Sequence, residues 1–251
     1  MAQPSTAETN VTDRSVLNYW RAGLDDVPDE VWLRPELKVL LLPDNALTGL
    51  PGRIGTLTSL HTLDLGHNKL RAVPEELGDL TALSRFLYLH DNALTELPAS
   101  LGRLTRLAYL NVGENRLTAL PETLGGLAGL VELRVQHNEL TRLPESVGSL
   151  SALRELWLRG NRLTRLPTGV GRLTELRELE LRENAFTDVP DALRGLPLLR
   201  RVDLRANHLT DLPAWVAELP ALEKLDLRWN DVHISDHVLR ALDARGCVVL
   251  R

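Results

Sequence analysis

Hydrophobic residues recur along this chain with one fixed rhythm. In the stretch LRELELREN, residues 176–184, leucine occupies positions 176, 179 and 181, and the positions between are charged. An L-x-L step has the two-residue period of a β-strand, with leucine on one side and the intervening residue on the other. The pattern therefore predicts a short strand with one buried and one exposed face, and it raises the question of what the exposed charges face.

The same unit returns throughout the sequence and is marked by an asparagine. Successive asparagines are 23 residues apart, except that Asn68 and Asn92 are 24 apart. The unit reads L-x-x-L-x-L-x-x-N-x-L-T-x-L-P-x-x-L-G-x-L, and one copy, LRELWLRGNRLTRLPTGVGRL, spans residues 153–173 with Val170 in place of one leucine. A period of this length indicates a repeat architecture, in which each unit buries its apolar face by stacking on its neighbours. The marker residues are Asn45, Asn68, Asn92, Asn115, Asn138, Asn161, Asn184, Asn207 and Asn230.

Each part of the unit has a physical role. Stacked strands form a parallel sheet with a spacing of about 4.8 Å. The asparagine can satisfy backbone groups where the chain turns inward, and the Leu-Pro step suits the start of a helical turn on the return path. A shift of one residue would move the leucines to solvent, so the fixed period is a packing requirement.

The unit closely resembles the leucine-rich repeat family, in the cytosolic 23-residue type found in bacterial proteins and similar to the plant intracellular Ras-group repeats. The resemblance covers nearly the whole chain. It implies an α/β fold: a right-handed, curved solenoid or horseshoe, with a parallel β-sheet on the concave face and short helical or 3-10 turns on the convex face. It also implies a protein- or peptide-binding scaffold or adaptor that uses its concave face and performs no catalysis.

Degenerate units at the two ends are expected to cap the stack. Residues 15–31, SVLNYWRAGLDDVPDEV, match the unit with Ala22 in place of asparagine. Residues 235–246, SDHVLRALDARG, predict an amphipathic helix with Ser235 as N-cap and Gly246 past its end. Adding 23 to Leu225 and Leu227 gives Val248 and Leu250, which predicts a last strand in the same register.

The chain is accordingly divided into four parts of one domain. We expect a disordered tail over residues 1–10, a capping repeat over 11–36, regular repeats over 37–232 and a helix–strand cap over 233–251. One regular unit carries an extra residue between Leu83 and Leu87. This insertion is either an accommodated surface bulge or a bulge that re-aims Arg85 and Phe86 toward a ligand.

Function in such a fold depends on the exposed strand positions. Three positions in each unit would face the concave side: before the first strand leucine, between the two leucines, and after the second. Exposed aromatic residues there have no core role, and such residues dominate binding hot spots, so an aromatic binding patch is expected. The candidate binding residues are Phe86, Tyr88, Tyr109, Asn111, Arg134, Trp157, Arg159, Glu180, Arg182, Asp203, Arg205 and Arg228.

The C-terminal half of this face is charged instead. A column of arginines after the second leucine lies beside an acidic band that includes Glu178, Glu180 and Asp203. Two interpretations stay open. The charges form either a lattice of exposed ion pairs, each worth about 0–1 kcal/mol, or an electrostatic docking strip that sets specificity and association rate.

Composition narrows the function classes. The net charge of -5 disfavours nucleic acid or an anionic membrane as partner. Cys247 is the single cysteine, so no disulfide can form within the chain. The first fifteen residues lack the apolar core of a signal peptide, and no apolar run reaches membrane-spanning length. We therefore expect a cytoplasmic protein.

Sequence motifs for catalysis or cofactors are missing. There is no phosphate-binding glycine loop, no H-E-x-x-H and no C-x-x-C, and His67 and His90 on separate strands read as polar surface rather than as a metal site. No cofactor and no metal are expected. We predict an unknown protein or peptide partner and a monomer, although unpaired terminal strand edges leave a dimer open. The alternatives are a secreted effector or toxin-like protein that binds a host or competitor target, and, less favoured, a small-ligand receptor or enzyme.

Overall fold

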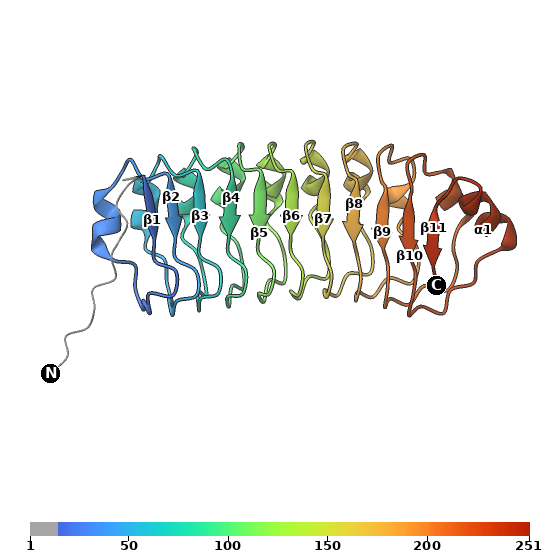
Figure 1. Ribbon diagram of the computed structural model, residues 1–251, viewed down its shortest axis with the longest axis horizontal. Helices are drawn as coiled ribbons and strands as arrows, with labels where there is room; N and C mark the ends of the chain where they lie inside the picture. The colour runs from blue at the N-terminus through green and yellow to red at the C-terminus, as the bar shows by residue number, and fades with distance from the viewer. Residues whose placement is uncertain (1–14) are drawn as a thin grey trace.

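The computed structural model describes residues 15–251, so the predicted disordered tail over 1–10 lies outside the described residues. Eleven short strands form one open parallel sheet in sequence order (Figure 1). The strands are β1 (Val16–Asn18), β2 (Val39–Leu41), β3 (Thr62–Asp64), β4 (Phe86–Tyr88), β5 (Tyr109–Asn111), β6 (Glu132–Arg134), β7 (Glu155–Trp157), β8 (Glu178–Glu180), β9 (Arg201–Asp203), β10 (Lys224–Asp226) and β11 (Val248–Leu250).

A 3-10 segment follows each of the first nine strands on the return path. Each begins directly after a proline whose φ lies between -58° at Pro28 and -74° at Pro74, the range that the pyrrolidine ring imposes. The segments are η1 (Asp29–Leu33), η2 (Gly52–Thr56), η3 (Glu75–Asp79), η4 (Ala99–Arg103), η5 (Glu122–Gly126), η6 (Glu145–Ser149), η7 (Thr168–Arg172), η8 (Asp191–Leu193) and η9 (Ala214–Glu218).

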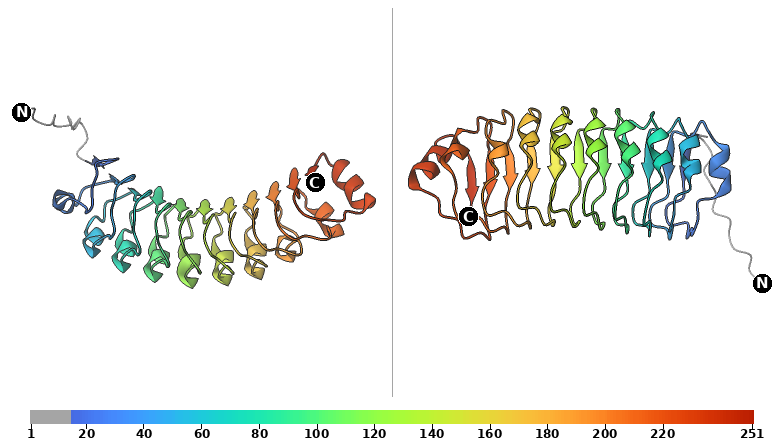
Figure 2. Two further views of the ribbon diagram at one scale, coloured as in Figure 1. Left: turned by 90° about the horizontal axis from the view of Figure 1, so that it is seen from below. Right: turned by 180° about the vertical axis from the view of Figure 1, so that it is seen from behind.

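The stack is curved, with the strands on the inner side and the 3-10 segments on the outer side (Figure 2, left). A 3-10 segment is wider than a strand, so the outer side is the longer one. Glycine allows neighbouring segments to approach closely there: a Cβ on Gly78 would lie 2.4 Å from the carbonyl oxygen of Ser100. The predicted solenoid, with its concave parallel sheet and convex helical turns, is confirmed.

The core between sheet and outer segments is built almost entirely of leucine. The central residues of β2 to β10 and most leucines of the return path are buried, and Phe186 is the largest fully buried side chain. This explains how a chain with 4% aromatic residues still fills its interior. The period-2 pattern leaves the first and third residue of each strand on the concave surface.

The repeated asparagine is a buried backbone partner, as predicted. Nδ2 of Asn138 donates to the carbonyl oxygens of Val112 (3.0 Å) and Val135 (3.1 Å), and its Oδ1 accepts from the N–H of Leu117 (2.9 Å). Each such side chain therefore joins two successive repeats. The residue before the asparagine turns the chain through positive φ, from 50° at Asp91 to 66° at Gly160.

The C-terminal cap contains the expected helix, but its strand register differs from the prediction. Helix α1 spans Asp236–Asp243, and Oγ of Ser235 accepts from the N–H of Val238 (3.4 Å). Strand β11 pairs Leu225 with Val249 rather than with Val248, so the predicted 23-residue register is wrong by one residue. An α-helix replaces the 3-10 segment in this unit, and the longer return path changes the spacing. Val248 is consequently exposed.

The extra residue of the 24-residue unit does not disturb the sheet. Phe86 pairs with Thr62 on one side and with Tyr109 on the other, so the insertion is absorbed before β4 begins. Phe86 therefore keeps the column position that the other units occupy, and Arg85 lies exposed beside the strand. Within residues 15–251, no helix has the length and apolar character needed to cross a lipid bilayer.

Candidate functional site on the concave face

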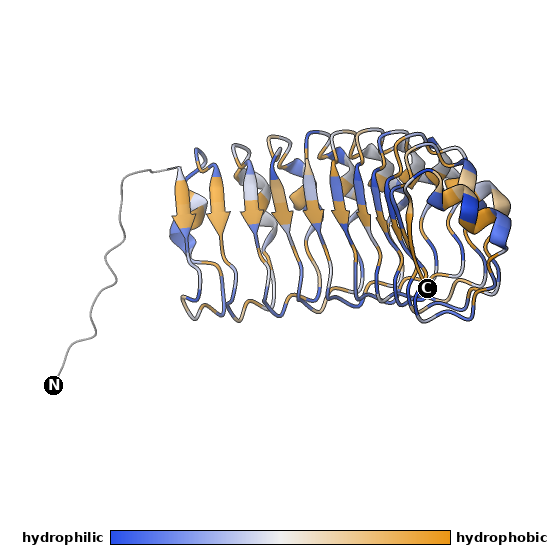
Figure 3. Cartoon of the chain, turned by 45° about the vertical axis from the view of Figure 1, so that its right-hand side comes forward, coloured by the Kyte–Doolittle hydropathy of each residue, from blue (hydrophilic) through white to orange (hydrophobic). Residues whose placement is uncertain are grey.

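The concave face changes character along its length. Strand β2 reads VLL, whereas β8 reads ELE and β9 reads RVD. In Figure 3 the strands nearest the N-terminal end are hydrophobic along most of their length, and hydrophilic positions become frequent further along. Neighbouring strands pair in register, so the same position of successive repeats forms a continuous column across the sheet. Residues at equivalent positions of adjacent repeats are therefore neighbours.

Three aromatic rings of β4 and β5 form a contiguous cluster, here called the aromatic patch: Phe86, Tyr88 and Tyr109. The ring centroids of Phe86 and Tyr88 are 5.8 Å apart, those of Phe86 and Tyr109 are 5.6 Å apart, and those of Tyr88 and Tyr109 are 5.1 Å apart. Phe86 is 41% exposed. Burial raises the pKa of Tyr109 to about 12, so its hydroxyl stays a neutral donor at physiological pH.

Arg134 on β6 extends the aromatic patch toward the C-terminal half. Its guanidinium carbon lies 5.8 Å from the centroid of the Tyr109 ring and 5.0 Å from that of Trp157 on β7. Its Nε donates to Oε1 of Glu132 (2.5 Å), and the indole Nε1 of Trp157 donates to Glu155 (3.2 Å). These bonds fix both side chains, so rings and guanidinium form one preorganised stripe across four strands.

Most charges of β8 to β10 are paired within the chain. Arg201 donates to Glu178 (3.0 Å), while Arg205 bonds Asp203 through two nitrogens. The remaining pairs join Arg228 with Asp226 (2.7 Å), Arg205 with Asp226 (3.5 Å), Arg159 with Glu183 (3.0 Å) and Arg182 with Glu183 (2.9 Å). The arginine and acidic columns are therefore largely an internal lattice rather than a row of free charges.

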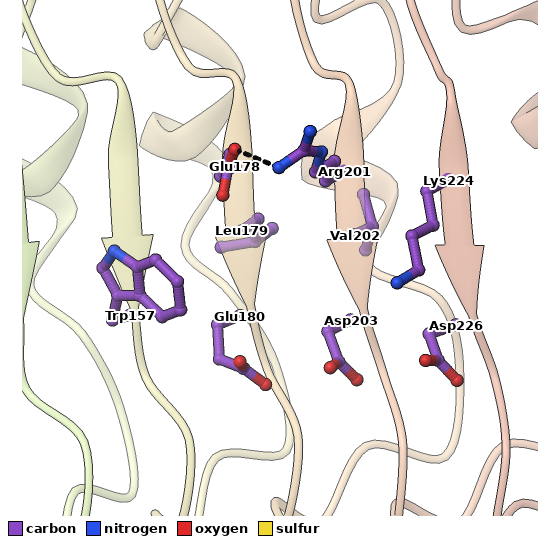
Figure 4. A pocket seen from close by; sticks show the side chains of 9 residues that line it. All are labelled: Trp157, Glu178, Leu179, Glu180, Arg201, Val202, Asp203, Lys224 and Asp226. Carbon is purple, nitrogen blue, oxygen red and sulfur yellow. Dashed lines mark hydrogen bonds and ion pairs between the residues drawn. The ribbon is translucent and has the colours of Figure 1, made fainter.

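A hollow of about 130 Å³ lies where the stripe meets this lattice (Figure 4). Trp157 forms one wall, and carboxyl groups of β8, β9 and β10 lie in a row along it. Oε1 of Glu180 is shielded from solvent and has no hydrogen-bond partner. Burial, followed by the charge of Asp203, raises the pKa of Glu180 to about 7. The protonated carboxyl of Glu180 can donate to Asp203, which relieves the repulsion between the two groups.

The histidines near the N-terminal rim form a polar contact rather than a metal cage. Nδ1 of His67 lies 2.6 Å from Oδ2 of Asp91, and the His67 and His90 rings meet edge to face at 4.7 Å. Burial and the neighbouring His67 lower the pKa of His90. Across residues 15–251, no three His, Cys, Asp or Glu side chains converge in a way that could hold a metal ion.

The twelve predicted binding residues all lie in the expected columns, but they differ in accessibility. Asn111 is 7% exposed, and its Oδ1 accepts from the N–H of Gly113 (3.0 Å), so it serves the turn after β5 and offers little surface. The stripe Phe86, Tyr88, Tyr109, Arg134 and Trp157 comes together as one surface. Arg159, Glu180, Arg182, Asp203, Arg205 and Arg228 lie beyond it in the charged lattice.

Trp229 is a surface residue that the sequence analysis missed. It is 63% exposed, and three guanidinium carbons surround its ring, those of Arg182 (5.1 Å), Arg205 (5.8 Å) and Arg228 (5.8 Å). It occupies the positive-φ position directly before the marker asparagine, with φ 62°. The repeat register could have identified Trp229, because the residue directly before the marker asparagine lies just beyond the three concave positions of each repeat.

Comparisons with known proteins agree with this geometry. A sequence model described as a leucine-rich repeat region matches residues 84–181, and one described as a leucine rich repeat matches 35–94 and 174–232. No curated protein matches the chain.

Solved structures with the same fold come from bacteria and plants. A leucine-rich repeat protein of Leptospira interrogans has 27% identity and a TM-score of 0.64, with 93% of this chain and 76% of that chain covered. The ectodomain of GASSHO1/SCHENGEN3 from Arabidopsis thaliana, in complex with CASPARIAN STRIP INTEGRITY FACTOR 2, has 32% identity and a TM-score of 0.77. A plant peptide hormone receptor, RGFR1 in complex with RGF2, has 26% identity and a TM-score of 0.68.

The shared region is a part of each plant receptor. The alignments cover 90% and 89% of this chain but 28% of the GASSHO1/SCHENGEN3 chain and 45% of the RGFR1 chain. Together the matched residues of the family models run from 35 to 232, across the regular repeats. The chain belongs to the leucine-rich repeat family.

Proposed function

We propose that this protein is a non-catalytic scaffold that binds a protein or an extended peptide on its concave face. The observation that carries the proposal is the stripe of Phe86, Tyr88, Tyr109, Arg134 and Trp157. These rings take no part in the leucine core, yet they contact one another on the accessible side of the sheet. Covering one large apolar side chain contributes roughly 1.5–3 kcal/mol, so three or four rings would supply a usable affinity.

Two further observations support the proposal. Hydrogen bonds from Arg134 to Glu132 and from Trp157 to Glu155 hold the stripe in place, which lowers the entropy lost when a partner binds. Members of the family generally serve as binding scaffolds, and RGFR1 and GASSHO1/SCHENGEN3 are solved with bound partners. We also propose that the protein acts as a cytoplasmic monomer. The free, buried thiol of Cys247 suits a reducing compartment.

Affinity capture from a native cell lysate tests the proposed surface. The bait is the full chain, compared with a triple variant, Phe86→Ala, Tyr109→Ala and Trp157→Ala. The matched control is Leu33→Ala, because Leu33 is an apolar residue at the end of η1 that is 78% exposed. We expect a discrete partner with the native and control baits and its loss with the triple variant, while all three proteins melt at similar temperatures. A partner that the triple variant retains would reject the concave stripe as the binding surface.

A further inference from the structure

Among the described residues, Glu180 is the one acidic group lining the hollow between β7 and β10 that forms no ion pair. Each arginine nearby forms its ion pair with another carboxylate, and Nε of Arg182 is buried without a hydrogen-bond partner. Arg201 pairs with Glu178, Arg205 pairs with Asp203 and Asp226, and Arg182 pairs with Glu183. A shielded oxygen without a donor is costly, and it is satisfied either by a proton or by a cation.

The wall of the hollow also favours a cation. Trp157 presents its indole beside Glu180 (Figure 4), and tryptophan is the aromatic side chain that attracts cations most strongly. The same ring already carries the Arg134 guanidinium at 5.0 Å on the side of β6. Lys224 also lines the hollow, and it forms no ion pair with any of the described residues. It lies near Asp226, at the end of the hollow away from Trp157 (Figure 4). At the Trp157 end of the hollow, Glu180 therefore has no cation of the described chain paired with it.

We propose that this hollow receives a basic side chain, arginine or lysine, of an extended partner whose apolar residue covers the aromatic patch. This inference rests on the proposed function and names the chemistry of the partner. The incoming cation takes the place of the proton shared by Glu180 and Asp203, stacks on Trp157 and donates to Oε1 of Glu180.

The geometry sets the spacing between the two anchors. Tyr109 lies on β5 and Glu180 on β8, three strands further along the sheet. At about 4.8 Å per strand the two sites are about 14 Å apart, and about 19 Å separate β4 from β8. An extended chain advances about 3.3 Å per residue, so the basic anchor is about four to six positions away from the apolar anchor in the partner sequence.

The exchange of a proton for a cation makes binding depend on pH. The charged groups around Glu180 are Glu155 and Arg159 of the β7 repeat, Glu178 and Arg182 of its own repeat, Arg201, Asp203 and Arg205 of the β9 repeat, and Lys224 and Asp226 of β10. Because the arginines among these groups pair with other carboxylates, burial and the charge of Asp203 raise the pKa of Glu180 to about 7. Its ionised fraction then rises about tenfold between pH 6 and pH 8, and the affinity for a cation rises with it.

A peptide selection on the 251-residue chain tests the inference. Random 12-residue peptides displayed on phage are selected at pH 8, and the enriched sequences without histidine are synthesised with a terminal fluorophore. Dissociation constants are measured by fluorescence anisotropy at pH 6 and pH 8. The test variant is Glu180→Gln, which mimics the protonated carboxyl. The matched control is Glu139→Gln, whose native carboxylate pairs with Arg162 away from the hollow.

We expect one enriched basic residue, four to six positions from an apolar residue. Replacing that arginine by citrulline, or that lysine by norleucine, should weaken binding at least tenfold at pH 8. The native chain and Glu139→Gln should bind about tenfold more tightly at pH 8 than at pH 6, and Glu180→Gln should bind equally at both.

Failures of this inference and of the proposed function give different results. Peptides that require Phe86 and Tyr109 but carry no basic residue, or whose pH dependence survives in Glu180→Gln, overturn the inference and leave the proposed function standing. Peptides that bind the triple concave variant as well as the native chain, or a selection that yields no binder, count against both.

Discussion

Replacing Glu180 by glutamine should stabilise the protein at alkaline pH. The folded state raises the pKa of Glu180 from its ordinary value of 4.5 to about 7 because of burial and the nearby charge of Asp203. A folded pKa above the unfolded one means that the favourable contribution is complete below pH 4.5. It is lost as pH rises from 4.5 through 7, where the unfolded chain ionises freely and the folded chain ionises at a cost. Glutamine keeps the shape and a donor toward Asp203 without the charge.

The size of the effect follows from the shift. A change from 4.5 to about 7 corresponds to a ceiling of about 3 kcal/mol. Glu180 keeps part of its surface in contact with water, which screens the interaction, and about half of that ceiling remains. At pH 8 we therefore expect Glu180→Gln to raise the free energy of unfolding by about 1.5 kcal/mol and the melting temperature by about 3 °C. At pH 5 the variant and the native chain should melt together.

Thermal melts followed by circular dichroism at pH 5, 6, 7 and 8 supply the measurement. The control is Glu178→Gln, which lies on the same strand and removes one side of the ion pair with Arg201. This control should cost about 0–1 kcal/mol with no gain at high pH. A Glu180→Gln protein that melts below the native chain at pH 8, or that differs from it equally at all four pH values, would refute the electrostatic reasoning.

Three further predictions concern the stack itself, and urea denaturation checks each of them. Leu133→Ala empties a fully buried position at the centre of the array and should lower the free energy of unfolding by about 2–5 kcal/mol. Asn138→Ala leaves the N–H of Leu117 without its partner, while the carbonyls of Val112 and Val135 keep the Nδ2 groups of Asn115 and Asn161 as donors, and it should cost about 1–3 kcal/mol; a neutral result would show that water replaces the side chain. Gly78→Ala drives a Cβ to 2.4 Å from the Ser100 oxygen and should cost about 1–3 kcal/mol, whereas Gly49→Ala, with open space around it, should change little.

The backbone plan of this protein was predictable because the repeat period determines it. A 23-residue rhythm with L-x-L at fixed positions leaves one arrangement that buries the leucines at the repeated positions, and the strand columns follow directly. The prediction failed in register at β11, where a helix replaces the 3-10 segment and Val249 rather than Val248 pairs with Leu225. The 24-residue unit shows the opposite case, since its extra residue lies in a connection that absorbs it.

The sequence predicts where the surface residues lie, but it predicts less well which of them contact one another. The columns correctly place Phe86 beside Tyr109, but they do not show that Arg134 bridges Tyr109 and Trp157. A long charged side chain has several possible partners within reach, and the aligned repeat sequences do not determine which of them it contacts. The sequence also did not predict the interaction of Glu180 with Asp203, because the raised pKa of Glu180 depends on its burial and on which carboxylates the nearby arginines pair with.

Photo-crosslinking from a single concave position tests the central claim most directly. The crosslinking residue p-benzoylphenylalanine replaces Tyr109 in one protein and the exposed Leu33 in another, and both proteins are irradiated in native lysate. If the partner binds on the concave face, position 109 gives a discrete adduct that excess unmodified native chain suppresses, and position 33 gives no such adduct. An adduct from position 33 alone, or the same adduct from both positions, would contradict it.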